Sequence, residues 1–168
     1  TRRSSDLDTS TSLQKTYIVH DTMTVTLVAF TGFDCRDTVS SAIIVHPKPN
    51  PSYNVNDSAQ CLNGNKFIFN NTSKIYSGTM TYTWETDDGY KAGQMDTGHT
   101  FNKEGTYKVM LRALSSEGCR DSFVRTDTVY PKPDPAFLIN KNRQCLNDQL
   151  YLYTNKSAIA YGKLHYEW

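Results

Sequence analysis

Four cysteines carry the most reactive side chains of this 168-residue sequence. They are Cys35, Cys61, Cys119 and Cys145. No two of them stand close enough in sequence to form a Cys-x-x-Cys metal knuckle, and the four histidines follow no matching spacing, so a zinc site is not expected. Disulfide bonds formed in an oxidising, extracellular setting are the better interpretation.

Two adjacent carboxylates, Asp87 and Asp88, precede Gly89 and form a weak calcium candidate, because hard cations bind carboxylate oxygens. A polar turn without a metal is the favoured interpretation. The sequence shows no recurring Ser-His-Asp or Cys-His order, no glycine-rich phosphate loop and no carboxylate pair in an evident pocket. We therefore predict no enzymatic activity, no catalytic residues and no cofactor other than, at most, Ca²⁺.

An internal repeat organises these residues. An offset of 84 positions takes Cys35 to Cys119 and Cys61 to Cys145, and it also relates the proline-rich segments 47–51 and 131–135. About 24 of the 84 aligned pairs are identical, and the alignment needs no gap. A fixed period of this length is typical of tandem copies of one structural unit.

The proline-rich segments are the natural boundaries of the repeat, because alternate prolines favour a stiff, extended spacer. Dividing the chain there predicts the C-terminal portion of a preceding repeat at 1–51, a complete repeat at 52–134 and the N-terminal portion of a following repeat at 135–168. Each flank is too short to support a core of its own. The chain is then either an excerpt of a longer array or the repeating unit of a fibre.

Apolar and polar residues alternate in short segments at 22–29, 66–70, 79–84, 106–113 and 122–129. Period-two alternation bounded by Asn, Gly, Asp and Ser predicts strands with one buried face. Several such strands within one period favour a small Ig-like β-sandwich. The predicted fold class is all-β, with tandem sandwich repeats.

Four aromatic residues are predicted to have structural roles in these sandwiches. Tyr82 and Trp84 alternate on a central strand, where a large ring fills the space between the sheets, and Trp168 repeats Trp84. The turn 102–105 ends in a glycine that can adopt positive φ. Tyr107, just after it, occupies the position of a tyrosine corner.

Charge and hydropathy exclude two classes of partner. A formal net charge of +1 gives no basic face for nucleic acid. The sequence has no apolar run of about 18 residues, so membrane insertion is not expected.

The segment Trp84-Glu85-Thr86-Asp87-Asp88-Gly89, followed by His99-Thr100-Phe101 and by Gly105-Thr106-Tyr107-Lys108-Val109-Met110-Leu111, resembles the PKD (polycystic kidney disease) repeat. That family carries Trp-x-Phe-Gly-Asp-Gly, then His-x-Tyr and Gly-x-Tyr-x-Val-x-Leu. Thr86 and Asp87 depart from it, since they stand where the family has Phe-Gly. The resemblance implies an Ig-like sandwich and covers the whole chain when the two partial copies are counted.

The cysteine-containing variant of the repeat is similar to repeats of giant Bacteroidetes surface proteins, including gliding-motility adhesins secreted by the type IX system. This resemblance implies an extracellular protein at the cell surface. Its partners would be neighbouring repeats and, in addition, surface polysaccharide or other cell-surface proteins. Thr22, Thr38, Ser58 and Thr128 each follow an aspartate and precede an apolar residue or alanine, which is the pattern of O-glycosylation in that group.

The disulfide connectivity stays open at this stage. In an Ig-like strand order, Cys61 lies near the C-terminal end of the complete repeat and Cys119 near its N-terminal end. A strand of about ten residues is roughly 33 Å long, whereas a disulfide requires Cα atoms within about 7 Å. Bonds between neighbouring repeats are therefore slightly favoured over a bond from Cys61 to Cys119.

Two functions compete. A structural module would form the stalk or filament of a long secreted adhesin. A binding module attached to a secreted hydrolase would use exposed aromatics such as Tyr76, Tyr90 or Tyr161 to contact carbohydrate or protein. These tyrosines do not recur at equivalent repeat positions, which favours the stalk.

Overall fold

The computed structural model describes residues 11–168, so the first ten residues of the predicted N-terminal repeat fragment lie outside the described residues. The chain forms two compact units, divided between Lys48 and Pro49. Strands dominate both, and the helical structure of the described residues is one short 3₁₀ helix, η1 (Leu146–Asp148). The all-β prediction is confirmed. Among the residues described here, none forms a helix long and apolar enough to cross a membrane.

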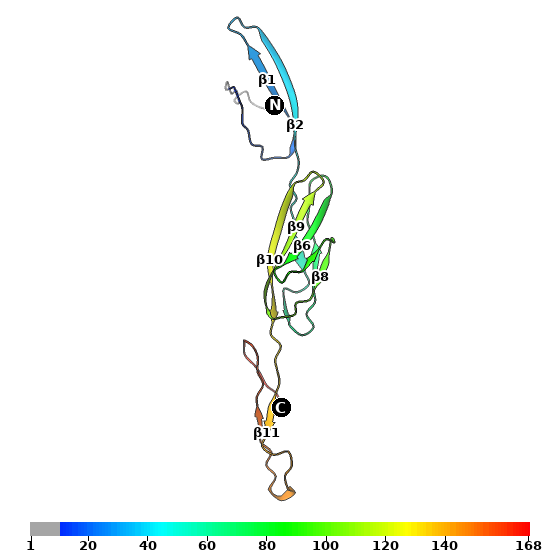
Figure 1. The fold of residues 1–168 in the computed structure, drawn as a ribbon, viewed down its shortest axis with the longest axis vertical. Coiled ribbons are helices and arrows are strands. Elements are labelled where there is room, and N and C mark those ends of the chain that lie inside the picture. Colours follow the sequence, from blue (N-terminus) through cyan, green and yellow to red (C-terminus); the bar gives the residue numbers. More distant parts are fainter. Residues whose placement is uncertain (1–10) are drawn as a thin grey trace. The chain divides into compact units, whose positions relative to one another are not determined.

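The first unit contains one antiparallel hairpin, drawn in blue and cyan in Figure 1, of β1 (Asp21–Phe30) and β2 (Arg36–Val45). Its register runs from Asp21 opposite Val45 to Phe30 opposite Arg36. The hairpin closes through a turn in which Asp34 has a φ of 61°. The period-two alternation predicted for residues 22–29 thus belongs to β1.

The second unit begins with a sandwich of two sheets. The larger sheet has the order β4-β10-β9-β6-β7. Its strands are β4 (Ala59–Cys61), β6 (Met80–Thr86), β7 (Lys91–Ala92), β9 (Gly105–Ser115) and β10 (Arg120–Tyr130). β4 pairs with β10 in parallel, whereas the other pairs are antiparallel.

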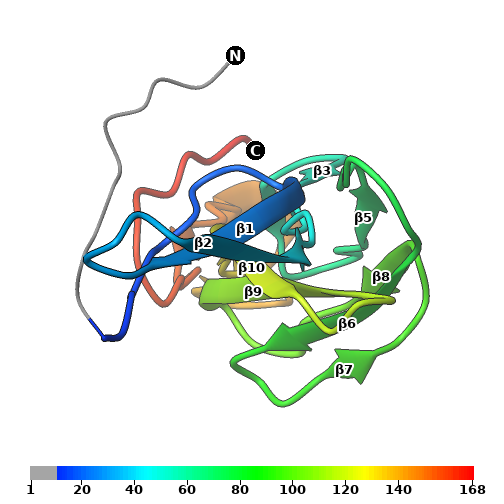
Figure 2. The ribbon, with the colours of Figure 1, turned by 90° about the horizontal axis from the view of Figure 1, so that it is seen from above.

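The smaller sheet has the order β3-β5-β8, with β3 (Tyr53–Val55), β5 (Phe67–Asn71) and β8 (Thr97–His99). Figure 2 shows β3 and β5 set apart from β6, β7 and β9. We call this sandwich, residues 49–130, the central module.

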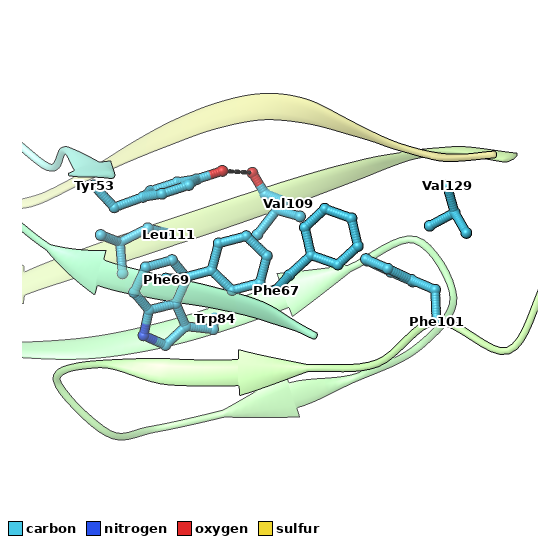
Figure 3. Close-up of a cluster of buried hydrophobic side chains, with 8 residues drawn as sticks. All are labelled: Tyr53, Phe67, Phe69, Trp84, Phe101, Val109, Leu111 and Val129. Atoms are coloured by element: carbon cyan, nitrogen blue, oxygen red, sulfur yellow. Dashed lines mark hydrogen bonds between the residues drawn. The ribbon is translucent and has the colours of Figure 1, made fainter. Parts of the chain in front are cut away.

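The core of the central module lies between these sheets because the strands bury alternate residues. In β5 the residues at 67, 69 and 71 are buried and those between them are exposed. The fully enclosed cluster joins both sheets, and Figure 3 draws its members: Tyr53, Phe67, Phe69, Trp84, Phe101, Val109, Leu111 and Val129. The hydroxyl of Tyr53 donates to the Val109 carbonyl at 2.8 Å, which ties β3 to β9.

The C-terminal portion of the second unit, residues 134–168, is a smaller element. It contains β11 (Phe137–Ile139) and β12 (Tyr153–Asn155), which pair antiparallel. An isolated bridge joins Asp134 to Ala158 next to them.

Strand registers coincide after an offset of 84 positions. Asp21 faces Val45 in the hairpin of the first unit, and Gly105 faces Val129 in the hairpin of the central module. Likewise Tyr53 faces Asn71, and 84 residues later Phe137 faces Asn155. Equivalent residues thus make equivalent backbone pairs in the central module and in each flanking portion.

Candidate functional site

The acidic turn after β6 is the first candidate, and hydrogen bonds within the protein occupy both of its carboxylates. One oxygen of Asp87 accepts from the Lys108 amide at 3.1 Å. Oδ1 of Asp88 accepts from the Thr86 hydroxyl and from the Tyr90 amide, and its Oδ2 lies 2.7 Å from Nε2 of His99. The turn needs Gly89, whose φ is +94°.

The electrostatics of Asp88 match this geometry. Desolvation raises the pKa of its carboxyl, but hydrogen bonds from Thr86, His99 and the Tyr90 amide outweigh that effect and hold the pKa below its usual value. Among the described residues, no group of three or more His, Cys, Asp or Glu side chains is arranged to hold a metal ion. The carboxylates of this turn are instead held by hydrogen bonds from groups within the protein.

His99 extends this turn into the core. Its ring stacks on Tyr90 with centroids 4.3 Å apart, and it meets Phe101 edge-on at 4.6 Å. The Tyr90 hydroxyl lies 2.5 Å from that of Thr97. Sequence reasoning used His99 only as a member of a motif and missed its pairing with Asp88, because an eleven-residue separation hides that contact.

The four cysteines are free thiols in the structure. Cys61 lies opposite Tyr130 at the end of β10, whereas Cys119 immediately precedes the first residue of that strand. The length of β10 therefore separates them, about 36 Å at roughly 3.3 Å per residue, far beyond disulfide reach. The two cysteines mark opposite ends of the central module.

The four candidate O-glycosylation residues differ in access. Thr22, Thr38 and Ser58 are exposed, whereas Thr128 is half-buried and pairs with Thr106 in the β9–β10 ladder. The aspartates before Thr22 and Thr38 each accept a hydrogen bond from the backbone amide of the threonine that follows. Access therefore favours the first three residues over Thr128.

Two of the tyrosines considered for ligand contact make contacts within the fold. Tyr90 stacks on His99 as described, and the Tyr161 hydroxyl donates to the Val129 carbonyl at 3.2 Å. Tyr76 is 80% exposed and lies outside the named strands. The three do not form an aromatic platform on one strand.

The residues predicted to have structural roles show a clear division. Trp84 is fully buried and donates from Nε1 to the Gln94 carbonyl at 3.1 Å, and Tyr82 packs against the same core. The Tyr107 hydroxyl donates to the Lys103 carbonyl at 2.8 Å, which is the geometry of a tyrosine corner. Trp168 differs from the expectation of a core residue, because 76% of it is exposed.

Trp168 belongs to a cluster of exposed rings that we call the C-terminal aromatic cluster: Phe137, Tyr151, Tyr153 and Trp168. The centroid of Trp168 lies 5.8 Å from that of Phe137 and 6.0 Å from that of Tyr153. In the central module, the equivalent distances from Trp84 are 5.0 Å to Tyr53 and 5.8 Å to Phe69. A cleft beside the cluster is lined by Pro133, Pro135, Ala136, Phe137, Leu164 and Trp168, among others.

A pair of side-chain amides that sequence reasoning missed recurs in the central module and in the C-terminal portion. Asn56 Nδ2 and Gln60 Nε2 both donate to the Lys66 carbonyl, at 3.0 and 3.2 Å. Asn140 and Gln144 do the same for the Leu150 carbonyl, at 2.8 and 2.9 Å. The sequence could have indicated this pair, because the asparagine and the glutamine are identical in the two copies.

A buried carboxylate lies on β10. Asp127 is fully buried, neither of its oxygens has a hydrogen-bond partner among the described residues, and Nε of Arg125 is 4.0 Å away. Desolvation raises the pKa of Asp127, and the charge of Arg125 only partly opposes that effect. At the equivalent position of the first unit stands Ile43.

Comparisons with known proteins concern the central module. Residues 48–130 match the sequence model of the PKD domain family. Among solved structures, the PKD1 domain of Vibrio anguillarum Epp aligns with a TM-score of 0.45 and 20% identity, over 51% of this chain and 96% of that chain. The PKD1 domain from the Vibrio cholerae metalloprotease PrtV gives 0.41 and 21%, over 51% and 98%.

A third solved structure, from a study of the promiscuous specificity of carbohydrate-binding modules of the β-sandwich superfamily, gives a TM-score of 0.47 and 17% identity. That alignment covers 67% of this chain and 52% of the other. The search of curated proteins returned no match.

Proposed function

We propose that this chain is a spacer segment of a secreted cell-surface adhesin or filament. The premise is that residues 48–130 form a PKD-like module with an Ig-like sandwich fold. PKD-like modules of this kind are structural or binding accessory modules. The spacer role is mechanical: each module adds a fixed length of folded chain, and the proline-rich segments limit bending between modules.

The observation that carries the proposal is the recurrence of strand registers after 84 residues. The β1–β2 and β9–β10 hairpins pair equivalent residues, and so do the β3–β5 and β11–β12 pairs. A spacer needs the same unit repeated, because each added copy extends the molecule in one dimension. The repetition of backbone geometry supports the spacer.

The polar groups of the central module support the same role. The acidic turn, His99 and Asn65 all bond to neighbouring segments of the module. Asn65 is 4% exposed, accepts from the Phe101 amide at 2.8 Å and donates to the Phe101 carbonyl at 2.9 Å. These contacts link segments of the module that are distant in the sequence.

Cysteine positions extend the proposal to the joints between modules. Because Cys61 and Cys119 lie at opposite ends of the central module, each would bond a cysteine of an adjacent module. Such bonds would stiffen the array. Peptide mapping of native protein without reduction should find Cys61 and Cys119 in bonds to cysteines of other modules, and a bond between the two would refute this extension.

Single-molecule stretching of the 168-residue chain tests the spacer role. The central module should resist extension and then open in one discrete step, which unfolds about 29 nm of chain at roughly 3.5 Å per residue. Trp84→Ala should lower the opening force, whereas Tyr76→Ala at an exposed position should leave it unchanged. Gradual extension of the wild-type chain without a force peak would overturn the proposal.

The location at the cell surface has a separate test. Antibodies against the central module should label intact producing cells, and mild protease treatment of those cells should remove the label. Label that appears only after the cells are opened would refute the surface location while leaving the mechanical role standing.

A further inference from the structure

The outer face of the larger sheet in the central module carries an open cleft of about 470 Å³. Three neighbouring strands, β6, β9 and β10, supply the exposed side chains that line it. We call it the arginine cleft, after its members Thr81, Thr83, Arg112, Leu114, Arg120 and Ser122. Leu111 and Ala113, which alternate with its members on β9, are buried in contrast. The cleft therefore lies on the solvent side of the sheet, away from the core.

Strand register brings the members of the cleft together. Arg112 lies on β9 between Thr83 of β6 and Ser122 of β10. The next outward residue of β9, Leu114, lies in the same way between the two remaining members of the cleft. Residues two apart in a strand project to the same face, so the two rows are neighbours on one surface. The cleft thus combines two cations, three hydroxyls and one apolar side chain.

The acidic residue next to Arg120 projects to the other face of the sheet. Asp121 follows Arg120 in β10 and pairs with Ala113, which is 1% exposed. Directly paired residues share a face, so the carboxylate of Asp121 projects to the side of Ala113 and away from the guanidinium of Arg120.

The equivalent arginine of the first unit has a partner that the central module lacks. Arg36 stands at the position of Arg120, and its Nη2 lies 2.7 Å from Oδ1 of Asp34. The residue equivalent to Asp34 is Gly118, which has no side chain to offer. The ion pairs found among the described residues of the central module do not include Arg120.

Arg112 is the second difference, because its equivalent in the first unit is Val28. Nε of Arg112 donates to Glu85 at 3.3 Å, and the same carboxylate lies 3.7 Å from Nζ of Lys91. Two cations therefore share one acidic group. Both differences between the units act in the same direction, and together they leave an excess of positive charge at the arginine cleft.

We propose that the arginine cleft binds an acidic polysaccharide, whose carboxylate or sulfate groups its two arginines hold. Guanidinium groups form paired, charge-assisted hydrogen bonds with such groups. The hydroxyls of Thr83 and Ser122 can both donate and accept, as sugar hydroxyls do. Leu114 is 43% exposed and offers an apolar surface to the carbon–hydrogen face of a sugar ring.

An acidic peptide is the other polymer that two arginines could attract. A bound peptide gains much of its affinity from backbone hydrogen bonds at an open strand edge. The central strand of the cleft, β9, is paired on both sides, with β6 and with β10. Contacts in the cleft must therefore come from side chains, which favours a ligand rich in hydroxyls.

Isothermal titration calorimetry of the 168-residue chain in low-salt buffer tests the proposal with four oligomers of similar length. They are oligogalacturonate, a sulfated dextran, a neutral dextran and oligoglutamate. An acidic glycan should bind, and the neutral dextran should bind at least about tenfold more weakly, because it offers no charge-assisted hydrogen bond. Comparing oligogalacturonate with the sulfated dextran distinguishes carboxylate from sulfate recognition.

Three variants of the cleft should each weaken binding of the acidic glycan by about tenfold or more. Arg112→Val introduces the residue of the first unit, and Arg120→Gln removes the second cation. Gly118→Asp returns an acidic partner to Arg120. That position has a φ of +80° and nothing within 4 Å of an added Cβ, and Asp34 adopts positive φ at the equivalent place.

Arg36→Gln is the matched control, because it removes the same charge at the equivalent position of the first unit. It should leave the affinity unchanged. Equal weakening by Arg36→Gln and Arg120→Gln would overturn the proposal, since it would show attraction by net charge alone. Wild-type protein that binds neither acidic glycan, or that binds oligoglutamate as tightly as the better of the two, would also overturn it.

The inference rests on the outer face of the central module and not on the spacer role. Failure of the stretching experiment would therefore leave it intact. Absence of glycan binding would likewise leave the spacer role intact.

Discussion

The same aromatic positions occur in the central module and in the C-terminal portion, yet they are buried in one and exposed in the other. Trp84 and Phe69 are fully buried, whereas Trp168 and Tyr153 are 76% and 48% exposed. Their centroid separations are nevertheless 5.8 and 6.0 Å. Residues 137–168 are thus sufficient to bring the rings together, whereas the core of the central module also contains Val109, Leu111 and Val129 from β9 and β10.

The comparison predicts a large difference between two equivalent substitutions. Trp84→Ala should lower the free energy of unfolding of the central module by about 3–5 kcal/mol, because it removes a fully buried ring and leaves a cavity. Trp168→Ala should change that free energy by less than about 0.5 kcal/mol in dilute monomer. Urea denaturation followed by circular dichroism measures both. Equal effects would show that the two tryptophans do not differ in burial.

The second prediction concerns the loop after β4. Asn65→Ala should destabilise the central module by roughly 2–3 kcal/mol, because the Phe101 amide and carbonyl would lose their partner inside the protein. Its equivalent, Gln149, is exposed, so Gln149→Ala should have almost no effect on the same urea midpoint. A neutral Asn65→Ala would mean that water replaces the lost bonds.

The sequence could predict local features of this structure better than contacts between distant residues. Alternation identified β1, β5, β6, β9 and β10, and the repeat offset located the equivalent residues, since both depend on patterns that are visible in the sequence. The sequence could not reveal that Asp88 pairs with His99 or that Asn65 binds Phe101, because those contacts join residues distant in the chain. Burial of Trp168 was expected from its identity with Trp84, but burial depends on a covering strand pair and not on the residue itself.

Asp127 and its equivalent Ile43 give the third prediction. Asp127→Ile should stabilise the central module by about 1–2 kcal/mol, because a carboxylate without hydrogen-bond partners among the described residues is replaced by an apolar side chain. Arg125, the nearby cation, is 35% exposed at its side chain and can turn to water. Thermal unfolding at neutral pH measures the gain. A loss of stability would show that the Asp127–Arg125 contact is itself stabilising.

The pH dependence of stability offers a check on the same residue. Burial raises the pKa of Asp127 in the folded state, so the folded protein holds the proton more tightly than the unfolded chain. Its contribution to stability is therefore greatest below the unfolded pKa and is lost as pH rises through the folded pKa. Asp127→Asn should remove this decline, and the difference between wild type and variant isolates it from other groups.

The smallest effect is expected at the acidic turn, which lies on the surface. Asp88→Asn should cost about 0.5–1 kcal/mol, because it weakens a partly exposed hydrogen bond to His99. Since the folded pKa of Asp88 lies below its usual value, the wild-type advantage should be present above the unfolded pKa and disappear as pH falls through the folded pKa.

A chelator distinguishes this explanation from calcium binding at Asp87 and Asp88. If the carboxylates act only as hydrogen-bond acceptors, adding EDTA to wild type should not change its midpoint of thermal unfolding, and adding Ca²⁺ to Asp88→Asn should not restore what the substitution lost. A rise in the wild-type midpoint with Ca²⁺ that is absent in Asp88→Asn would instead identify a metal site. The acidic turn would then bind a metal ion in addition to connecting β6 to β7.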